Sequence, residues 1–210
     1  MLLPVLTIWI INTEVDVGMR TTRKILGKFL MAALLLLLAA ACTPAGVYHD
    51  PNMDFGGIQS VAVLPFANLT TDKNASDRVR DALETSLMST GAIYVVPAGE
   101  VARGISRARM MDPTAPSTDE AKQLGSILKV QAVMVGTIRE YGEVRSGSAT
   151  ANVISLSMRM IETQTGREIW SAASTKGGIG MTERLFGGGG HAMNEVTMEA
   201  IHDLLNKLFM

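Results

Sequence analysis

The chain has 210 residues, 19 Lys and Arg against 20 Asp and Glu, a formal net charge of −1 and one cysteine. This length suits a single domain with a substantial core. The absence of a basic stripe in the sequence argues against nucleic-acid binding, and a lone cysteine excludes an internal disulfide.

Residues 1–18, MLLPVLTIWIINTEVDVG, do not read as the start of a secreted protein. They precede a basic patch and contain Glu14 and Asp16, whereas a signal peptide begins with its positive region. We interpret residues 1–18 as a start-site artefact, with Met19 as the expected start. A second membrane segment is the alternative, but the apolar run 2–11 is shorter than the roughly 20 residues a spanning helix needs.

Residues 19–41 have the layout of a secretory signal peptide: a basic patch, then an apolar run from Phe29 to Ala41. The run ends in LAAAC, residues 38–42, which resembles the lipobox of bacterial lipoproteins. The leucine preferred three positions before the cysteine is replaced by Ala39, and alanine is tolerated there. The resemblance implies cleavage after Ala41 and acylation of Cys42. The alternative is a plain signal peptide or membrane anchor with an incidental cysteine.

Lipidation of Cys42 would fix the protein to a membrane, because each buried methylene contributes about 0.8 kcal/mol. Thr43 replaces the aspartate that retains lipoprotein-like chains in the inner membrane, so we expect the periplasmic face of the outer membrane. The leader carries four basic and two acidic residues, which leaves 169 residues with a net charge near −3.

Residues 42–57 are polar with Pro and Gly, and we expect them to form a lipidated tether to a periplasmic domain over residues 58–210. The near-continuous apolar run 58–66 predicts a central strand. Val79, Leu83 and Leu87 then recur at helical spacing, in a helix expected from Asn74 to Ser89.

The middle of the chain predicts a short strand over 92–97 and a helix over 99–109. Ser117 and Glu120 form a capping-box pattern that opens a third helix. The run 131–141 is a further apolar strand. In the next strand Ile154, Leu156 and Met158 alternate with serines, which predicts one buried and one wet face.

The expected elements end with a turn at residues 163–168, a strand that returns after it, and a helix over residues 193–208. The early crossovers predict parallel pairing and the late hairpin antiparallel pairing. The sequence therefore predicts an α/β fold: one domain with a mixed sheet and helices on both faces, an α/β/α sandwich.

No pattern in the sequence points to catalysis. His49, His191 and His202 have no neighbours at metal-ligand spacing, and the glycine-rich run 177–190 lacks the strand, lysine and helix of a phosphate-binding loop. We therefore expect no metal, no cofactor and no enzymatic activity.

Three segments together resemble a known family: SVAVLPFANLT, LKVQAVMVGTIREYGEVRSG and VISLSMRMIETQTGREIWSAAST. They are similar to the CsgG-like lipoproteins of the outer membrane, which include the curli secretion channel and the LpoB activator of peptidoglycan synthases. The turn of this signature is carried by Glu162, Thr165, Gly166, Arg167, Glu168 and Trp170. The resemblance implies a cell-envelope role in curli assembly or a related secretion process.

The curli channel inserts two transmembrane hairpins. Both corresponding segments of this sequence are too short to form such a hairpin. Residues 142–150 are polar, and residues 176–190 hold seven glycines and a single aromatic. A spanning hairpin needs roughly 20 residues or more. We expect a member of the family without the pore.

The remaining prediction is a binding module. Tyr141 and Arg145 in a loop over 141–148, and Leu185 and Phe186 in the glycine-flanked loop, are candidate partner contacts. The leading hypothesis is a lipid-anchored accessory protein for envelope assembly or secretion that binds an unidentified periplasmic or outer-membrane protein, with a homo-oligomer as an option. An activator of a peptidoglycan synthase and a subunit of a secretion channel are the alternatives.

Overall fold

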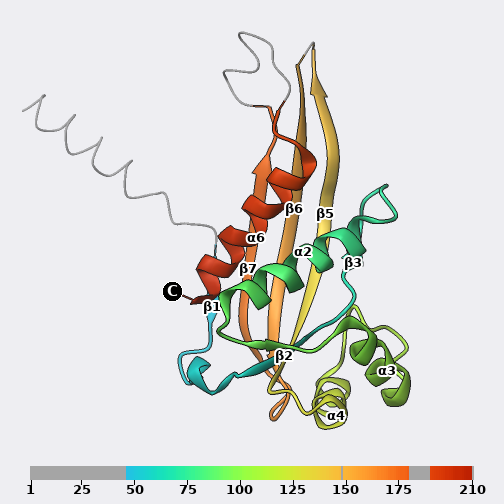
Figure 1. The fold of residues 1–210 in the computed structure, drawn as a ribbon, viewed down its shortest axis with the longest axis vertical. Coiled ribbons are helices and arrows are strands. Elements are labelled where there is room, and N and C mark those ends of the chain that lie inside the picture. Colours follow the sequence, from blue (N-terminus) through green and yellow to red (C-terminus); the bar gives the residue numbers. More distant parts are fainter. Residues whose placement is uncertain (1–45, 148, 180–189, 210) are drawn as a thin grey trace, which may run out of the picture. The chain divides into compact units, whose positions relative to one another are not determined.

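The computed structural model describes residues 46–147, 149–179 and 190–209, and a mixed sheet runs through them (Figure 1). Seven strands form the sheet in the order β1-β7-β6-β5-β2-β4, with β3 paired to β5. The strands are β1 (Tyr48–His49), β2 (Ser60–Val63), β3 (Ala67–Asn68), β4 (Tyr94–Val95), β5 (Ala132–Ser146), β6 (Ala149–Glu162) and β7 (Glu168–Gly177). The helices are the 3-10 turn η1 (Phe55–Gly57), α2 (Ala75–Thr90), α3 (Ala98–Ala108), α4 (Thr118–Leu128) and α6 (Met193–Phe209).

The pairing directions confirm the predicted mixed sheet. β2 runs parallel to β4 and β5, and β3 runs parallel to β5. β5, β6 and β7 form an antiparallel meander, and β1 is antiparallel to β7. The parallel pairs are those whose connections contain helices, as crossover connections require.

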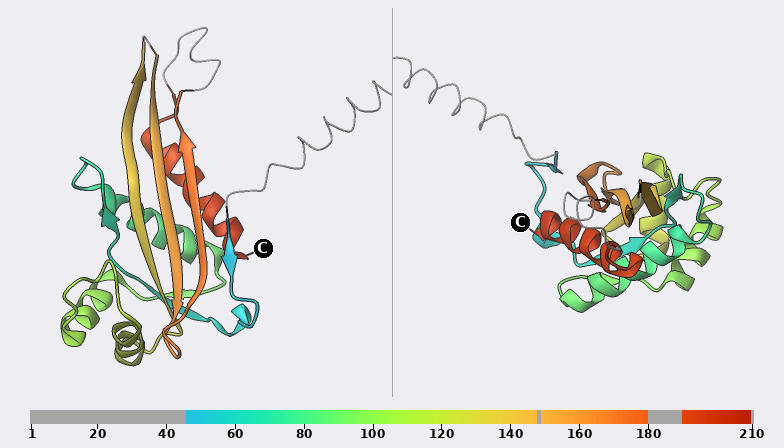
Figure 2. Two further views of the ribbon diagram at one scale, coloured as in Figure 1. Left: turned by 180° about the vertical axis from the view of Figure 1, so that it is seen from behind. Right: turned by 90° about the horizontal axis from the view of Figure 1, so that it is seen from above.

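Helices pack on both faces of the sheet, which confirms the predicted fold class. On one face α2 and α6 cover the strands, with Leu83 and Ile201 fully buried (Figure 1). On the other face Val101 of α3 and Leu124 of α4 pack against Val133. Figure 2, seen from behind, shows α3 and α4 near one end of the sheet, away from the tip of the β5–β6 hairpin.

The helix ends follow their local sequence. Glu120 N donates to Ser117 Oγ at 3.3 Å, and the Glu120 carboxylate accepts from Ser117 N, so the predicted capping box is present at α4. Gly91 ends α2 in the left-handed conformation, φ 63°, which glycine adopts without steric cost. Asn74 stands at the N-cap of α2 as predicted, but its side chain makes no cap hydrogen bond.

The alternation in β6 gives the strand its predicted two faces. Ile154, Leu156 and Met158 are fully or almost fully buried in the core under α6. Ser155 faces the opposite side and accepts a hydrogen bond from Thr175 Oγ1 at 3.0 Å. The open face of this sheet is therefore a ladder of small polar side chains.

Polar contacts fix α6 against β7. Lys207 Nζ donates to the carbonyl of Ala173 at 2.9 Å and to Asp203 Oδ2 at 2.7 Å. Lys176 of β7 lies 3.5 Å from the other carboxylate oxygen of Asp203. Partial burial pulls the pKa of Asp203 upward, but the hydrogen bond from Lys207 and the charges of Lys207 and Lys176 outweigh it, and the pKa is lowered from 3.8.

This lowered pKa predicts a pH-dependent contribution to stability. A carboxyl whose pKa is depressed by folding stabilises the native state above its ordinary pKa of 3.8, and the contribution is lost as the pH falls through the folded-state value. We expect Asp203→Asn to lower the free energy of unfolding by about 0.5–1 kcal/mol at pH 7. The difference from wild type should shrink in urea titrations below pH 3.8.

The control for Asp203→Asn lies on the same helix. Glu199 is exposed on α6, and Glu199→Gln should change stability little at either pH. A destabilisation by Asp203→Asn of the same size at both pH values would contradict the electrostatic explanation.

Candidate functional site

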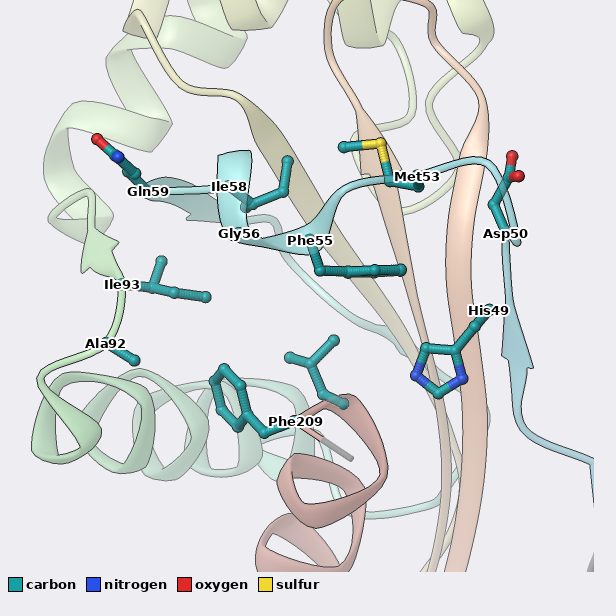
Figure 3. A pocket seen from close by; sticks show the side chains of 11 residues that line it. His49, Asp50, Met53, Phe55, Gly56, Ile58, Gln59, Ala92, Ile93 and Phe209 are labelled. Atoms are coloured by element: carbon teal, nitrogen blue, oxygen red, sulfur yellow. The ribbon is translucent and has the colours of Figure 1, made fainter.

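A cavity of about 910 Å³ opens at the end of the sheet where three segments meet. The segment before β2, the connection from α2 to β4 and the C-terminal end of α6 form its walls. We call it the base cavity, and its apolar lining consists of Met53, Phe55, Ile58, Ala92, Ile93, Leu208 and Phe209. Figure 3 shows Phe55, Ile93 and Phe209 around one common space. Its volume lies in the range of about 300–1,000 Å³ that is usual for ligand sites.

The segment that carries Phe55 is held to the domain by backbone and side-chain hydrogen bonds. Asp50 N donates to the carbonyl of Ile169 at 2.8 Å, which continues the pairing of β1 with β7. Asp54 Oδ1 accepts from Gly56 N at 3.0 Å and caps η1. Residues 46–57, expected to be a tether, are therefore partly built into the domain.

The one carboxylate among the described residues at the rim of the base cavity is engaged with other protein groups. The carboxylate of Asp50, a residue only 5% exposed, lies 3.0 Å from Arg167 Nη2 and accepts from Asn52 N. The ring of His49 meets Phe55 edge-on, with 5.5 Å between centroids. Figure 3 shows Asp50 and Gln59 pointing away from the common space. The larger part of the surface that the cavity offers a ligand is therefore apolar.

Phe209 makes this surface costly to leave in water. It is 48% exposed at the end of α6, directly beside the buried Leu208. Burial of apolar area contributes roughly 25 cal/mol per Å², so an apolar group that covered the cavity would gain free energy. The arrangement suits the binding of an aliphatic or aromatic group rather than a chemical reaction.

Two of the four predicted partner contacts, Tyr141 and Arg145, lie in the described residues. The prediction that a loop carries them is wrong. β5 continues to Ser146 and β6 begins at Ala149, so residues 141–148 are mostly strand and the turn is confined to the tip. Tyr141 is half-buried and packs against the core. Arg145 is exposed near the tip, with Nε 3.2 Å from Glu143 Oε1.

Tyr141 also lines a second cavity, of about 520 Å³, between α2 and α6. Arg78 and Asp81 of α2 and Met193 and Met198 of α6 form part of its wall. Its position close to the core fits a packing role for the tyrosine ring more directly than a role as an exposed anchor.

The other predicted site residues fall outside the described part of the chain. Ala41 and Cys42 lie before residue 46, and Leu185 and Phe186 lie between residues 180 and 189. Within the described ranges, no group of three His, Cys, Asp or Glu side chains is placed to hold a metal ion. Among the same residues, no helix has the length and apolar character to cross a bilayer.

The sequence did not reveal the base cavity, because its lining is scattered over 160 residues. A weak signal was present in MDFGGI, residues 53–58, where apolar side chains interrupt a segment otherwise typical of a tether. Only contacts between this segment, residues 92–93 and the end of α6 create the cavity.

A family model described as "Putative lipoprotein GNA1162-like" matches residues 56–204, which is more than half of the chain. The chain belongs to the GNA1162-like lipoprotein family. A member of this family is expected to be anchored to a membrane through its lipid.

A curated relative and two solved structures are similar to this chain. "Putative lipoprotein NMB1124/NMB1162" of Neisseria meningitidis serogroup B is 25% identical over 152 residues, 69% of this chain and 70% of the relative. The crystal structure of lipoprotein GNA1162 from Neisseria meningitidis shares 20% identity and a TM-score of 0.52, covering 72% of this chain and 98% of that one. A PelC dodecamer from Paraburkholderia phytofirmans shares 16% identity and a TM-score of 0.52, covering 79% and 98%.

These matches support only part of the resemblance to CsgG-like lipoproteins that the sequence suggested. The lipoprotein part is confirmed by the GNA1162-like match, while curli assembly finds no support in it. The two solved structures are similar in fold at identities of 20% and 16%, which is too low to carry function across.

Proposed function

We propose that this member of the GNA1162-like family is a lipid-anchored accessory protein of the cell envelope. It faces the periplasm from the outer membrane and binds protein partners, including further copies of itself, rather than catalysing a reaction. The observation that carries the proposal is the match to a lipoprotein family in a chain whose only cysteine follows a signal-like leader. Support for self-association comes from PelC, whose solved form is a dodecamer.

One observation also favours a second candidate, a subunit of an outer-membrane secretion channel. A twelve-subunit assembly of the same fold is possible, as the PelC structure demonstrates for that protein.

The short linker between Cys42 and the domain argues against the other alternative, an activator of a peptidoglycan synthase. β1 begins at Tyr48, so only a few residues separate Cys42 from the domain. An activator must reach through the peptidoglycan and needs a long tether.

The test of the proposed function is the mass and shape of the full lipidated protein in a mild detergent, by light scattering and negative-stain imaging. We expect a defined homo-oligomer. A ring with an open lumen would favour the secretion channel over the accessory protein. A strict monomer would contradict the self-association in the proposal.

The lipid anchor gives a separate prediction. Cys42→Ser removes the thiol that would take the diacylglycerol, so incorporation of labelled palmitate should be lost and the protein should leave the membrane fraction. Membrane fractionation with palmitate labelling measures both effects. Retention of the label in Cys42→Ser would contradict lipidation at this site.

A neighbouring substitution serves as the matched control for localisation. Thr43→Asp keeps Cys42 and should keep the palmitate label. In an enterobacterial host we expect it to move the protein from outer-membrane to inner-membrane fractions on a density gradient. If the wild-type protein, with Thr43, were found in inner-membrane fractions, the outer-membrane assignment would be contradicted.

A further inference from the structure

We propose that the base cavity is the acceptor site for a second copy of this chain, and that the loop carrying Leu69 is the group it accepts. This inference rests on the self-association in the proposed function and names the two surfaces that would meet. We call residues 68–72, which run from the last residue of β3 toward α2, the Leu69 loop.

The Leu69 loop presents an apolar side chain on a rigid support. Leu69 is 68% exposed, although its own N–H donates to the carbonyl of Ile138 at 2.9 Å. Asn68 Oδ1 accepts from Thr70 N at 3.0 Å, and Asn68 Nδ2 donates to the carbonyl of Asp72 at 2.8 Å. Arg78 lies 3.5 Å from the Asp72 carboxylate. A loop fixed in this way loses little conformational entropy when it binds.

The loop and the cavity lie at opposite ends of one helix. The Leu69 loop leads into the N-terminus of α2, while Ala92 and Ile93 of the cavity follow its C-terminus. A helix of 16 residues is about 24 Å long. The two sites also flank opposite edges of the β7-β6-β5 meander, since β3 pairs with β5 and β1 pairs with β7 (Figure 1).

A donor at one edge and an acceptor at the other make a head-to-tail contact. Such a contact joins different patches of the two copies, and it repeats until the rotation closes a ring or a filament grows. A two-fold contact, by contrast, would bring the same patch together from both copies. The positions of Leu69 and the base cavity therefore fit an assembly of many subunits better than a dimer.

The two sites contain opposite ends of helices. The base cavity lies where α2 and α6 both end, so the negative ends of two helix dipoles lie close to it. The Leu69 loop leads into the positive N-terminus of α2, where the side-chain charges of Asp72, Lys73 and Asp77 are mixed. Opposite dipole ends help to orient two copies as they approach.

A second copy explains the features of the cavity better than a membrane lipid. Arg167 is paired with the rim residue Asp50 at 3.0 Å, so an anionic headgroup that bound Arg167 would compete with an existing ion pair. The apolar side chain of Leu69 requires no such counter-charge. PelC adds that a protein of this fold assembles with itself into twelve subunits.

The test uses two variants of the full lipidated protein in detergent, one at each surface. Leu69→Asp places a charge on the donor, and Ala92→Trp fills the mouth of the acceptor at an exposed position. We expect each variant alone to be a monomer by light scattering. A 1:1 mixture should form dimers and nothing larger, because an intact cavity on one copy meets an intact Leu69 on the other.

Matched controls keep the outcome interpretable. Met111 is 95% exposed in the α3–α4 connection, and Met111→Asp should assemble as the wild type does. Circular dichroism and the midpoint of thermal unfolding establish that each variant is folded. Should Ala92→Trp not fold, Phe209→Glu blocks the same cavity from an exposed position.

The possible outcomes separate the inference from the proposed function. A wild-type monomer overturns the inference and the self-association in the proposed function. A wild-type oligomer that persists in Leu69→Asp or in Ala92→Trp overturns the inference alone. Two monomeric variants that do not form dimers when mixed would overturn the head-to-tail arrangement. A cavity filled by lipid would leave Ala92→Trp fully assembled.

Discussion

Trp170→Ala should lower the free energy of unfolding by about 3–5 kcal/mol, the usual cost of deleting a fully buried aromatic side chain. Trp170 lies in β7, is 1% exposed, and packs in the core beneath α6. Its Nε1–H donates to the carbonyl of Lys207 at 3.2 Å, near the end of that helix. Because typical domains are stable by only 5–15 kcal/mol, this loss is a large fraction of the total.

Urea unfolding followed by circular dichroism measures this effect, with Trp170→Phe as the control. Phenylalanine keeps most of the apolar volume but loses the N–H donor, so we expect a smaller loss than for alanine. The carbonyl of Lys207 then loses one partner at the helix end. Equal stability of the wild type and Trp170→Ala would show that α6 does not depend on this contact.

Gly125→Ala should destabilise the protein by about 1–3 kcal/mol, although alanine is the better helix former. Gly125 lies in α4, and a Cβ added there would come within 2.2 Å of Thr163 Cβ. Thr163 cannot swing away without cost, because its Oγ1 donates to the carbonyl of Val130 and its N–H donates to the carbonyl of Gln131. The clash must therefore move α4 away from the turn after β6.

A second helical glycine provides the control for Gly125→Ala. Gly99 lies in the first turn of α3, and a Cβ there would meet no atom within 4 Å. Gly99→Ala should leave stability unchanged or raise it by up to about 1 kcal/mol, because alanine loses less backbone entropy in a helix. If both substitutions raised the unfolding midpoint, the close approach at Gly125 would not be limiting.

The sequence was sufficient to predict elements whose signal is local. The apolar spacing of Val79, Leu83 and Leu87 predicted the buried face of α2, and all three residues are fully buried. The Ser117–Glu120 pattern predicted the start of α4. Such signals succeed because a helix face and a helix cap depend on residues three or four positions apart.

The β5–β6 hairpin shows where local reasoning failed. Its outer part is polar, and we expected a loop there. The strands nevertheless continue in register, from Tyr141 opposite Ile154 to Ser146 opposite Ala149. A strand held by its partner does not need a buried face at every position, because cross-strand hydrogen bonds satisfy its backbone.

The sequence by itself determined the order of the main elements, the mixed character of the sheet and the position of the lone cysteine after a signal-like leader. The tertiary structure alone decided that Phe55, Ile93 and Phe209 form one cavity, and that Leu69 stands exposed at the opposite end of α2. Periodicity in a sequence reports which side of an element is buried. Surfaces built from segments far apart in the chain arise only when the sheet and helices pack together.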